Sequence, residues 1–201
     1  CRRMDAANLT DAERGAARDI LDLIARDAAE LVRRAMAVTL KQSRNLPRDI
    51  AVKLAMDVDA VALPVLESSP VLEDEDLLRV LEHAGSGKRC AIAGRPHVAP
   101  IIVHELLDSR DERAVSIAAA NDGARFDDAA YQRAFAEFCE NPVVMDAFVA
   151  RSQLPLDVTE RLISHISDTA LQRLVSHHAL PPQVAVEIAE GARERATLDL
   201  V

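Results

Sequence analysis

The chain has 201 residues, of which 49% are hydrophobic, and its formal net charge is -9. The hydrophobic content is too high for a disordered chain, and the negative charge argues against a protein whose whole surface binds nucleic acid. Aromatic residues make up only 2% of the chain, and only six glycines are present. A β-sandwich would need more of both in its strands and turns, so the composition favours closely packed helices.

The first 42 residues predict two helices, over residues 11–26 and 28–42, and Thr10 with Glu13 forms a capping box at the start of the first. Beyond them, an apolar residue precedes each predicted helix pair at steps of 26, 26, 28, 28 and 26 residues. These apolar markers are Leu46, Leu72, Val98, Phe126, Leu154 and Leu180. Such even spacing indicates an internal repeat.

Each repeat predicts two helices that are joined by a short polar turn. Pro47 and Pro100 suit the first turn of a helix, and Asp157 with Glu160 forms another capping box. The second helix of one repeat has an apolar stripe at helical spacing. The stripe consists of Val58, Val61, Ala62, Val65 and Leu66. Pro64 falls within this stripe, and we expect it to kink or shorten the helix.

A single helix pair cannot bury its own apolar face, whereas stacked pairs share a continuous core. We therefore predict an all-α fold, a right-handed solenoid of stacked antiparallel helix pairs with 26–28 residues per unit. Residues 1–201 are expected to form one domain of about six to seven repeats, the last of them incomplete. We interpret Cys1-Arg2-Arg3 as a fragment edge ahead of Met4, and the alternative is a processed lipoprotein that begins at Cys1.

The repeat pattern resembles HEAT and leucine-rich-variant repeats, although these units are shorter than the ~40 residues of ordinary HEAT repeats. This resemblance implies a polar ladder within the stack, formed by Asp27 with Arg33, Asp111 with Arg113 and Asp168 with Arg173. Two stretches, VALPVLESSPVLEDEDLLRVLE (residues 61–82) and KRCAIAGRPHVAP (residues 88–100), are similar to the bacterial family called domain of unknown function 2336. This second resemblance extends from about Asp11 to about Ala189 and implies no functional residue.

No motif in the chain carries recognisable chemistry. The histidines (His83, His97, His104, His165, His177 and His178) lack an HExxH pattern, and Cys1, Cys90 and Cys139 lack a CxxC pattern. The acidic run 73–76 lacks the spacing of an EF-hand, and the GSGK sequence at 85–88 lacks that of a phosphate loop. We interpret these features as turn or surface histidines, a core cysteine at position 90, a helix start and an inter-helix turn. We predict no catalytic residue, no metal site and no cofactor.

All five aromatic residues fall within residues 126–148. Tyr131, Phe135 and Phe138 stand at i, i+4 and i+7, so they share one side of a helix. Two interpretations stay open, a thicker core in this longer unit or an exposed hot spot for a partner, to which aromatic residues contribute most. We expect Phe135 and Phe138 to be core residues and Tyr131 to be at least partly exposed. These three residues are the candidate partner contacts.

The predicted function is a non-enzymatic scaffold that binds a protein or peptide and could act in regulation. The alternative is a nucleic-acid-binding HEAT-like protein, or an enzyme, that acts through a groove on one face. Such a groove would be lined by Arg33, Arg34, Lys88, Arg89, Arg113, Arg161 and Arg173. Nucleic acid is the less favoured partner, and self-association through exposed terminal repeats is a further option.

The cysteine content bears on the cellular compartment of the protein. Three widely spaced cysteines form no disulfide framework, which favours the reducing cytoplasm. The chain contains no run of 18 apolar residues and no visible secretory signal, so we expect no membrane association.

Overall fold

The computed structural model describes residues 10–27, 29–163, 165–166, 170–171 and 173–174. This part of the chain forms eleven α-helices and no β-strand, which confirms the all-α prediction. One isolated parallel bridge joins Val98 to Ala124. None of the helices in the described ranges combines the length and the apolar character that a bilayer-spanning segment needs.

The helices follow one another with short connections. The first two, α1 (Asp11–Asp27) and α2 (Glu30–Leu40), confirm the two helices that were expected at the start of the chain. The others are α3 (Arg48–Ala55), α4 (Asp59–Ser68), α5 (Asp74–Leu81), α6 (Ser86–Ala93), α7 (Pro100–Asp108), α8 (Glu112–Ala120), α9 (Asp128–Phe138), α10 (Pro142–Phe148) and α11 (Leu156–Leu162).

The apolar markers have the same position in each repeat. Every odd-numbered helix from α3 to α11 begins two residues after a marker. Leu46, Leu72 and Val98 are buried, and Phe126 and Leu154 are partly buried against the same core. The marker thus anchors the loop that leads into each odd-numbered helix. The sixth marker, Leu180, lies outside the described residues.

The predicted helix starts are correct in part. The capping box at α1 is confirmed, because Thr10 N–H donates to Glu13 Oε2 (2.9 Å) and Glu13 N–H donates to Thr10 Oγ1 (3.3 Å). Pro100 opens α7 as expected, whereas Pro47 lies one residue before α3. The capping box of Asp157 with Glu160 is wrong, because α11 already begins at Leu156 and Asp157 lies within its first turn. Helix α4 continues through Pro64 to Ser68.

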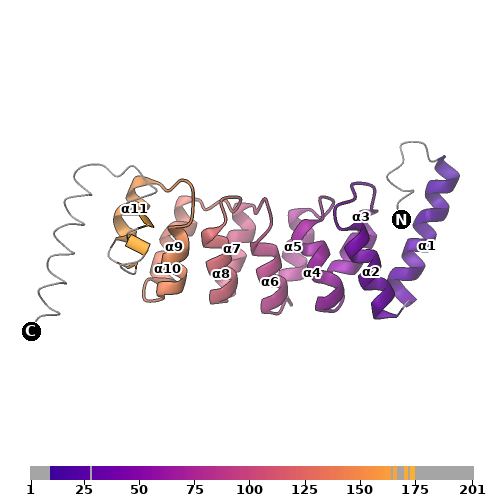
Figure 1. Cartoon of the computed structure of the whole chain (residues 1–201), viewed down its shortest axis with the longest axis horizontal. Helices are drawn as coiled ribbons and strands as arrows, with labels where there is room; N and C mark the ends of the chain where they lie inside the picture. The colour runs from indigo at the N-terminus through magenta and orange to yellow at the C-terminus, as the bar shows by residue number, and fades with distance from the viewer. Residues whose placement is uncertain (1–9, 28, 164, 167–169, 172, 175–201) are drawn as a thin grey trace, which may run out of the picture.

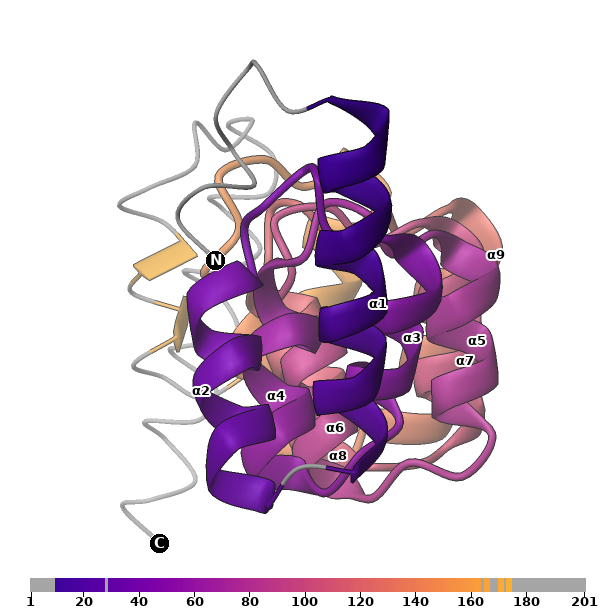
Figure 2. The same cartoon turned by 90° about the vertical axis from the view of Figure 1, so that its right-hand side faces the viewer.

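The helices lie in two rows along the length of the molecule (Figures 1 and 2). Each even-numbered helix from α2 to α8 contacts the next even-numbered helix, and we call this set, up to α10, the even row. The odd-numbered helices form the odd row, in which α1 contacts α3, α5 contacts α7, and α7 contacts α9. Within the pairs α1–α2, α3–α4, α5–α6 and α7–α8, the two helices also contact each other.

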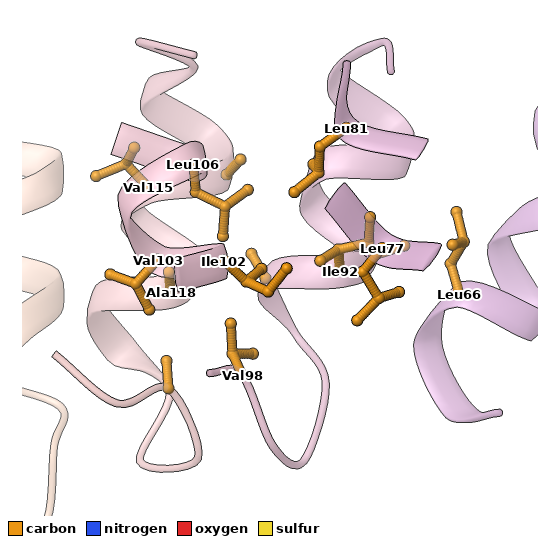
Figure 3. Packing of buried hydrophobic residues seen from close by; sticks show 14 of the residues in the cluster. Leu66, Leu77, Leu81, Ile92, Val98, Ile102, Val103, Leu106, Val115 and Ala118 are labelled. Carbon is orange, nitrogen blue, oxygen red and sulfur yellow. The ribbon is translucent and has the colours of Figure 1, made fainter. Parts of the chain in front are cut away.

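A continuous hydrophobic core lies between the two rows. It extends from Leu21 on α1 to Leu174 near the end of the described residues. Leu77, Ile92 and Ile102 come from three consecutive helices and lie close together in the interior (Figure 3). Many core residues are alanines, whose small side chains let neighbouring helices approach closely. The helix-pair contacts are compatible with the predicted stacking.

Candidate functional site

Four of the five aromatic residues, Phe126, Tyr131, Phe135 and Phe148, form one cluster at the junction of α9 and α10. Phe148 on α10 is fully buried at its centre, with its ring centroid 5.2 Å from Phe126, 5.8 Å from Tyr131 and 6.5 Å from Phe135. Phe126, which precedes α9, also lies 5.3 Å from Tyr131. These separations are typical of packed aromatic pairs, so the cluster is the interior of this repeat.

The expectation that Tyr131 is at least partly exposed is wrong. Its relative exposure is 6%, equal to that of Phe138 and close to the 3% of Phe135. Tyr131 and Phe135 are one turn apart, so a helix that buries Phe135 against Phe148 turns Tyr131 inward as well. Burial also raises the pKa of the Tyr131 phenol. The core interpretation is confirmed for Phe135 and Phe138, and the partner-contact role of all three residues stays an untested prediction.

Two arginines pack on this aromatic cluster, and neither contact was predicted. The Arg161 guanidinium of α11 lies 4.2 Å from the centroid of the Phe135 ring, and that of Arg151 lies 5.4 Å from Phe126. Both distances fall within the range of cation–π attraction. Arg161 therefore links α11 to α9.

The implied Asp–Arg ladder exists in a different form. The Nε and Nη2 atoms of Arg33 donate to the Asp57 carboxylate at 2.5 and 2.9 Å, in the turn before α4. Asp111 caps α8 through Ala114 N–H and lies 3.7 Å from Arg89 of α6, not beside Arg113. These bonds join successive helix pairs, and the predicted pair of Asp111 with Arg113 is wrong, because Asp111 pairs with Arg89 instead. The Asp27 side chain and Asp168 lie outside what the structure describes.

The hydrogen bonds of Asp57 explain its acidity. The bond from Arg33 is the main reason that its pKa lies below the usual range, and burial opposes this shift. The Val58 N–H and the charge of Lys88 lower the pKa of Asp57 further. Lys88 itself donates to the backbone oxygens of Asp57 (2.6 Å) and Ala55 (3.3 Å). A cation at these last carbonyls of α3 opposes the negative end of the helix dipole, so Lys88 is a helix cap in this structure.

The acidic run 73–76 marks the start of α5, as expected. Asp76 is buried, accepts from the Glu73 N–H (3.1 Å) and pairs with Arg48 of α3 (2.8 Å). Burial by itself raises the pKa of Asp76, yet the bonds from Arg48 and from the Glu73 N–H outweigh it, so the pKa is lowered overall. The run thus joins α5 to α3.

A second polar ladder, which the sequence did not reveal, lies at the C-terminal ends of the even row. The Arg95 guanidinium donates to the backbone oxygens of Leu66 and Ser69 (2.8 Å to Ser69) at the end of α4. Asn121 Nδ2 donates to the oxygens of Ala93 and Arg95, each at 2.8 Å, at the end of α6. Each side chain follows one even-row helix and caps the preceding one, which satisfies carbonyls that every helix end leaves free.

Arg151 repeats this arrangement at the end of α8. Its Nη1 atom donates to the oxygens of Ala118, Ala119 and Asn121 at 3.4, 3.3 and 2.9 Å. Its Nη2 atom donates to Ala124 O at 2.7 Å. Arg95 and Arg151 are each 8% exposed, and burial lowers the pKa of Arg95. We call Arg95, Asn121 and Arg151 the capping ladder.

The remaining sequence motifs lie in turns or contact other parts of the fold. Gly85 is the N-cap of α6, so the GSGK sequence is an inter-helix turn, and Cys90 packs partly buried against the core. His97 lies outside any helix, and His104 Nε2 lies 3.1 Å from Asp127 Oδ2. In the described ranges no three His, Cys, Asp or Glu side chains come together in a way that could hold a metal ion.

One open cleft, of about 600 Å³, lies between the α7–α8 turn and the α9–α10 turn. It is lined by Arg110, Glu112, Ala136, Glu137, Phe138, Glu140, Asn141 and Pro142. Arg110 has a left-handed backbone, with φ of 52°, and its side chain is 80% exposed. Its ionisable side chains are those of Arg110, Glu112, Glu137 and Glu140, and Arg110 Nε lies 4.0 Å from Glu137 Oε2.

The two rows present different chemistry to solvent. Ion pairs link neighbouring helices along the odd row, such as Arg18–Asp49 (2.9 Å) and Arg133–Asp108 (2.5 Å). Along α4, α6, α8 and α10, the positions that are not buried are mostly small or apolar, and we call this surface the even-row face. Its small and apolar members are Ala60, Leu63, Pro64, Gly87, Cys90, Gly94, Ser116, Ile117, Ala120, Val143, Ala147 and Ala150.

The family comparison gives a match over most of the chain. The model of an uncharacterised protein family conserved in bacteria, DUF2336, matches residues 61–201. The chain belongs to this family. The match includes both stretches that suggested it, but it begins at Val61 within α4 instead of near Asp11, and it extends beyond Ala189. No curated protein and no solved structure matches the chain.

Most of the structural features described above lie within the residues that match the DUF2336 model. The capping ladder, the aromatic cluster and nearly all of the even-row face lie within 61–201, whereas α1, α2 and α3 precede the match. Three of the seven basic residues of the alternative groove, Arg33, Lys88 and Arg161, contact other groups of this chain.

Proposed function

We propose that this DUF2336 protein is a non-enzymatic scaffold that binds a protein or peptide along the even-row face. In this proposal the helix pairs form a HEAT-like, right-handed α-solenoid. Solenoids of this kind present long surfaces on which extended or helical segments can lie. The observation that supports this function best is the chemical difference between the two rows.

The even-row face is suited to close contact. Most of the non-buried side chains of these four successive helices are small or apolar, and the charges beyond the first turns are few, such as Glu67 and Asp146. A partner helix or strand that lies on it therefore gives up little hydration of charged groups and buries apolar area, which is the main driving force for association. The odd row carries exposed ion pairs instead, and its solvation makes it a weaker docking surface.

The packing within each row also favours the even-row face as the binding surface. Even-row helices contact one another closely along the whole row, whereas α3 and α5 in the odd row hardly touch. A stack whose helices are closer together on one side bends toward that side. We therefore expect the even row to lie on the inner side of the curve, where a bound segment is contacted by several repeats at once.

The test uses two variants that add the same charge to different rows. Ala60→Arg with Ser116→Arg places two cations on the even-row face, and Ala129→Arg with Gln132→Arg places two cations on α9 of the odd row. Each protein is used as bait in extracts of the native cell, and bound proteins are quantified by mass spectrometry. A captured protein is then purified and titrated against each variant by calorimetry.

We expect the wild type and the odd-row variant to bind the same protein with equal affinity, and the even-row variant to lose it. Circular dichroism must show equal helix content in all three proteins. Equal binding by the even-row variant, or loss of binding only in the odd-row variant, contradicts this assignment of the binding surface.

A further inference from the structure

The even-row face carries acidic side chains along the edge where its helices begin. Asp59 is the first residue of α4, and Glu112 is the first residue of α8. Each stands two residues before the first buried residue of its helix, which is Val61 in α4 and Ala114 in α8. Asp59 and Glu112 therefore lie on the same side of their helices. Glu140 adds a third acid just before α10, and we call these three acids the acidic edge.

The described part of the chain does not neutralise the acidic edge. Asp59, Glu112 and Glu140 are exposed, and no side chain of the three forms a hydrogen bond or an ion pair within the described residues. Carboxylates of the odd row differ, since Asp49 and Asp108 are each paired with an arginine. The oxygens of the acidic edge thus keep their capacity to accept hydrogen bonds from a cation that the described residues do not supply.

Asp59 lies against the next helix of the even row. Its Oδ2 atom is 2.9 Å from the point where a Cβ atom of Gly87 would stand, and Leu63 Cδ2 is 3.9 Å from the same point. Gly87 lies in the first turn of α6, which has no acidic residue of its own. The positive end of the α6 dipole favours a carboxylate there. An acid with free acceptors therefore stands beside an apolar side chain of the even-row face.

At α8 and α10 the acidic edge borders the cleft of about 600 Å³ described above. Glu112 and Glu140 line this cleft together with Glu137, and Arg110 is the one cation among its lining residues. The Arg110 side chain is 80% exposed and its Nε atom lies 4.0 Å from Glu137 Oε2, so its charge is mostly solvated. The lining therefore has an excess of negative charge, and Glu112 and Glu140 are its unpaired acids.

The cleft has room for a long cationic side chain. Phe138 and Pro142 give it an apolar lining beside the three carboxylates. Lysine and arginine combine an apolar stem with a charged end, so the stem can pack on this lining while the charged end reaches the carboxylates. Pro142 is followed in α10 by Val143, an exposed member of the even-row face. A segment that lies on the even-row face thus passes next to the cleft.

The charges of the even-row face select the chemistry of the bound segment. On α4, α6, α8 and α10 the exposed acids are Asp59, Glu67 and Glu112, and the exposed base is Arg113. Unpaired acids beside an apolar surface favour a partner that carries cations and disfavour one that carries acids. We propose that the segment bound by the even-row face is basic and amphipathic, with a lysine or arginine side chain in the cleft. This inference rests on the function proposed above and adds the chemistry of the partner.

The probe for this proposal is a phage-displayed library of random peptides, selected on the full chain. Peptides that bind the wild type and the odd-row variant described above, but not the even-row variant, are sequenced and synthesised. We expect these peptides to combine apolar residues with more Lys and Arg than Asp and Glu. Their affinity for the wild type, measured by fluorescence anisotropy, should fall as the salt concentration rises, because salt screens exposed charge pairs.

Two further variants, each with three carboxylates replaced by amides, locate the effect. The first removes the acidic edge by Asp59→Asn, Glu112→Gln and Glu140→Gln. The matched control removes odd-row charges by Glu105→Gln, Asp128→Asn and Glu160→Gln. The first should weaken peptide binding at least about three-fold, since each exposed charge pair contributes a factor of about 1.4–5, and the control should change it less than about two-fold. Circular dichroism must show equal helix content.

The outcomes separate this inference from the proposed function. Selected peptides that are neutral or acidic overturn the inference and leave the proposed function intact. Equal affinity of basic peptides for the wild type and for the variant without the acidic edge does the same, as does an equal loss in the control. A library that yields no peptide sensitive to the even-row variant overturns the proposed function and this inference together.

Discussion

The capping ladder makes a strong prediction at Arg151. Its guanidinium donates to four backbone oxygens at the end of α8, and those of Ala119 and Ala124 accept no other hydrogen bond in the described part of the chain. Arg151→Met keeps most of the side-chain volume but removes every donor. Each buried carbonyl that is left without a donor costs about 1–3 kcal/mol, so two of them give about 2–6 kcal/mol. The variant also removes the desolvation penalty of a buried cation, which offsets part of this cost. We therefore expect the free energy of unfolding to fall by about 3 kcal/mol.

The control is Arg125→Met in the adjacent loop, where the arginine is exposed. It should change the free energy of unfolding by less than about 0.5 kcal/mol. Unfolding in urea, followed by far-UV circular dichroism, measures both variants, and hydrogen exchange of residues 112–124 locates the effect. Arg151→Lys should fall between them, because one ammonium cannot reach all four oxygens. Equal stability of Arg151→Met and Arg125→Met would refute the ladder as a source of stability.

Other residues give further predictions. Gly123→Ala should lower the melting temperature clearly, because a Cβ atom there collides with the backbone oxygen of Pro96, whereas Gly85→Ala, with no atom near its Cβ, should have little effect. Tyr131→Ala should cost about 3–5 kcal/mol in chemical unfolding because the ring is core, and a surface-like value contradicts its burial. The lowered pKa of Asp76 predicts stabilisation above the unfolded value of about 3.9 that is lost as pH falls through the folded pKa. Asp76→Asn should therefore show a smaller loss of stability than the wild type during acid titration.

Much of the fold follows from the spacing of apolar residues. The five markers from Leu46 to Leu154 each precede an odd-numbered helix by two residues. Loop anchoring requires an apolar side chain at one fixed position, and such a requirement leaves a clear periodic signal. Helix ends were less predictable, as Asp157 shows, because several polar residues near a helix start can each act as the cap.

The contacts between repeats could not be predicted from the sequence pattern. Arg95 and Arg151 resemble surface arginines in the sequence, because their acceptors are backbone carbonyls that come together only when the helices stack. Arg33 had acidic neighbours at several distances along the chain, and only the stacking selects Asp57. The exposure of Tyr131 depended on the rotation of α9 against α10, which spacing within one helix does not fix.

Site-specific photo-crosslinking in the native cell tests the proposed function most directly. A benzophenone amino acid is placed at Ser116 on the even-row face, at Ala60 on the same face, and at Gln132 on the odd row. We predict that Ser116 and Ala60 probes yield adducts with the same protein, identified by mass spectrometry, and that the Gln132 probe does not. Adducts from Gln132 alone, or adducts of the two even-row probes with unrelated proteins, would contradict a binding scaffold that uses the even-row face.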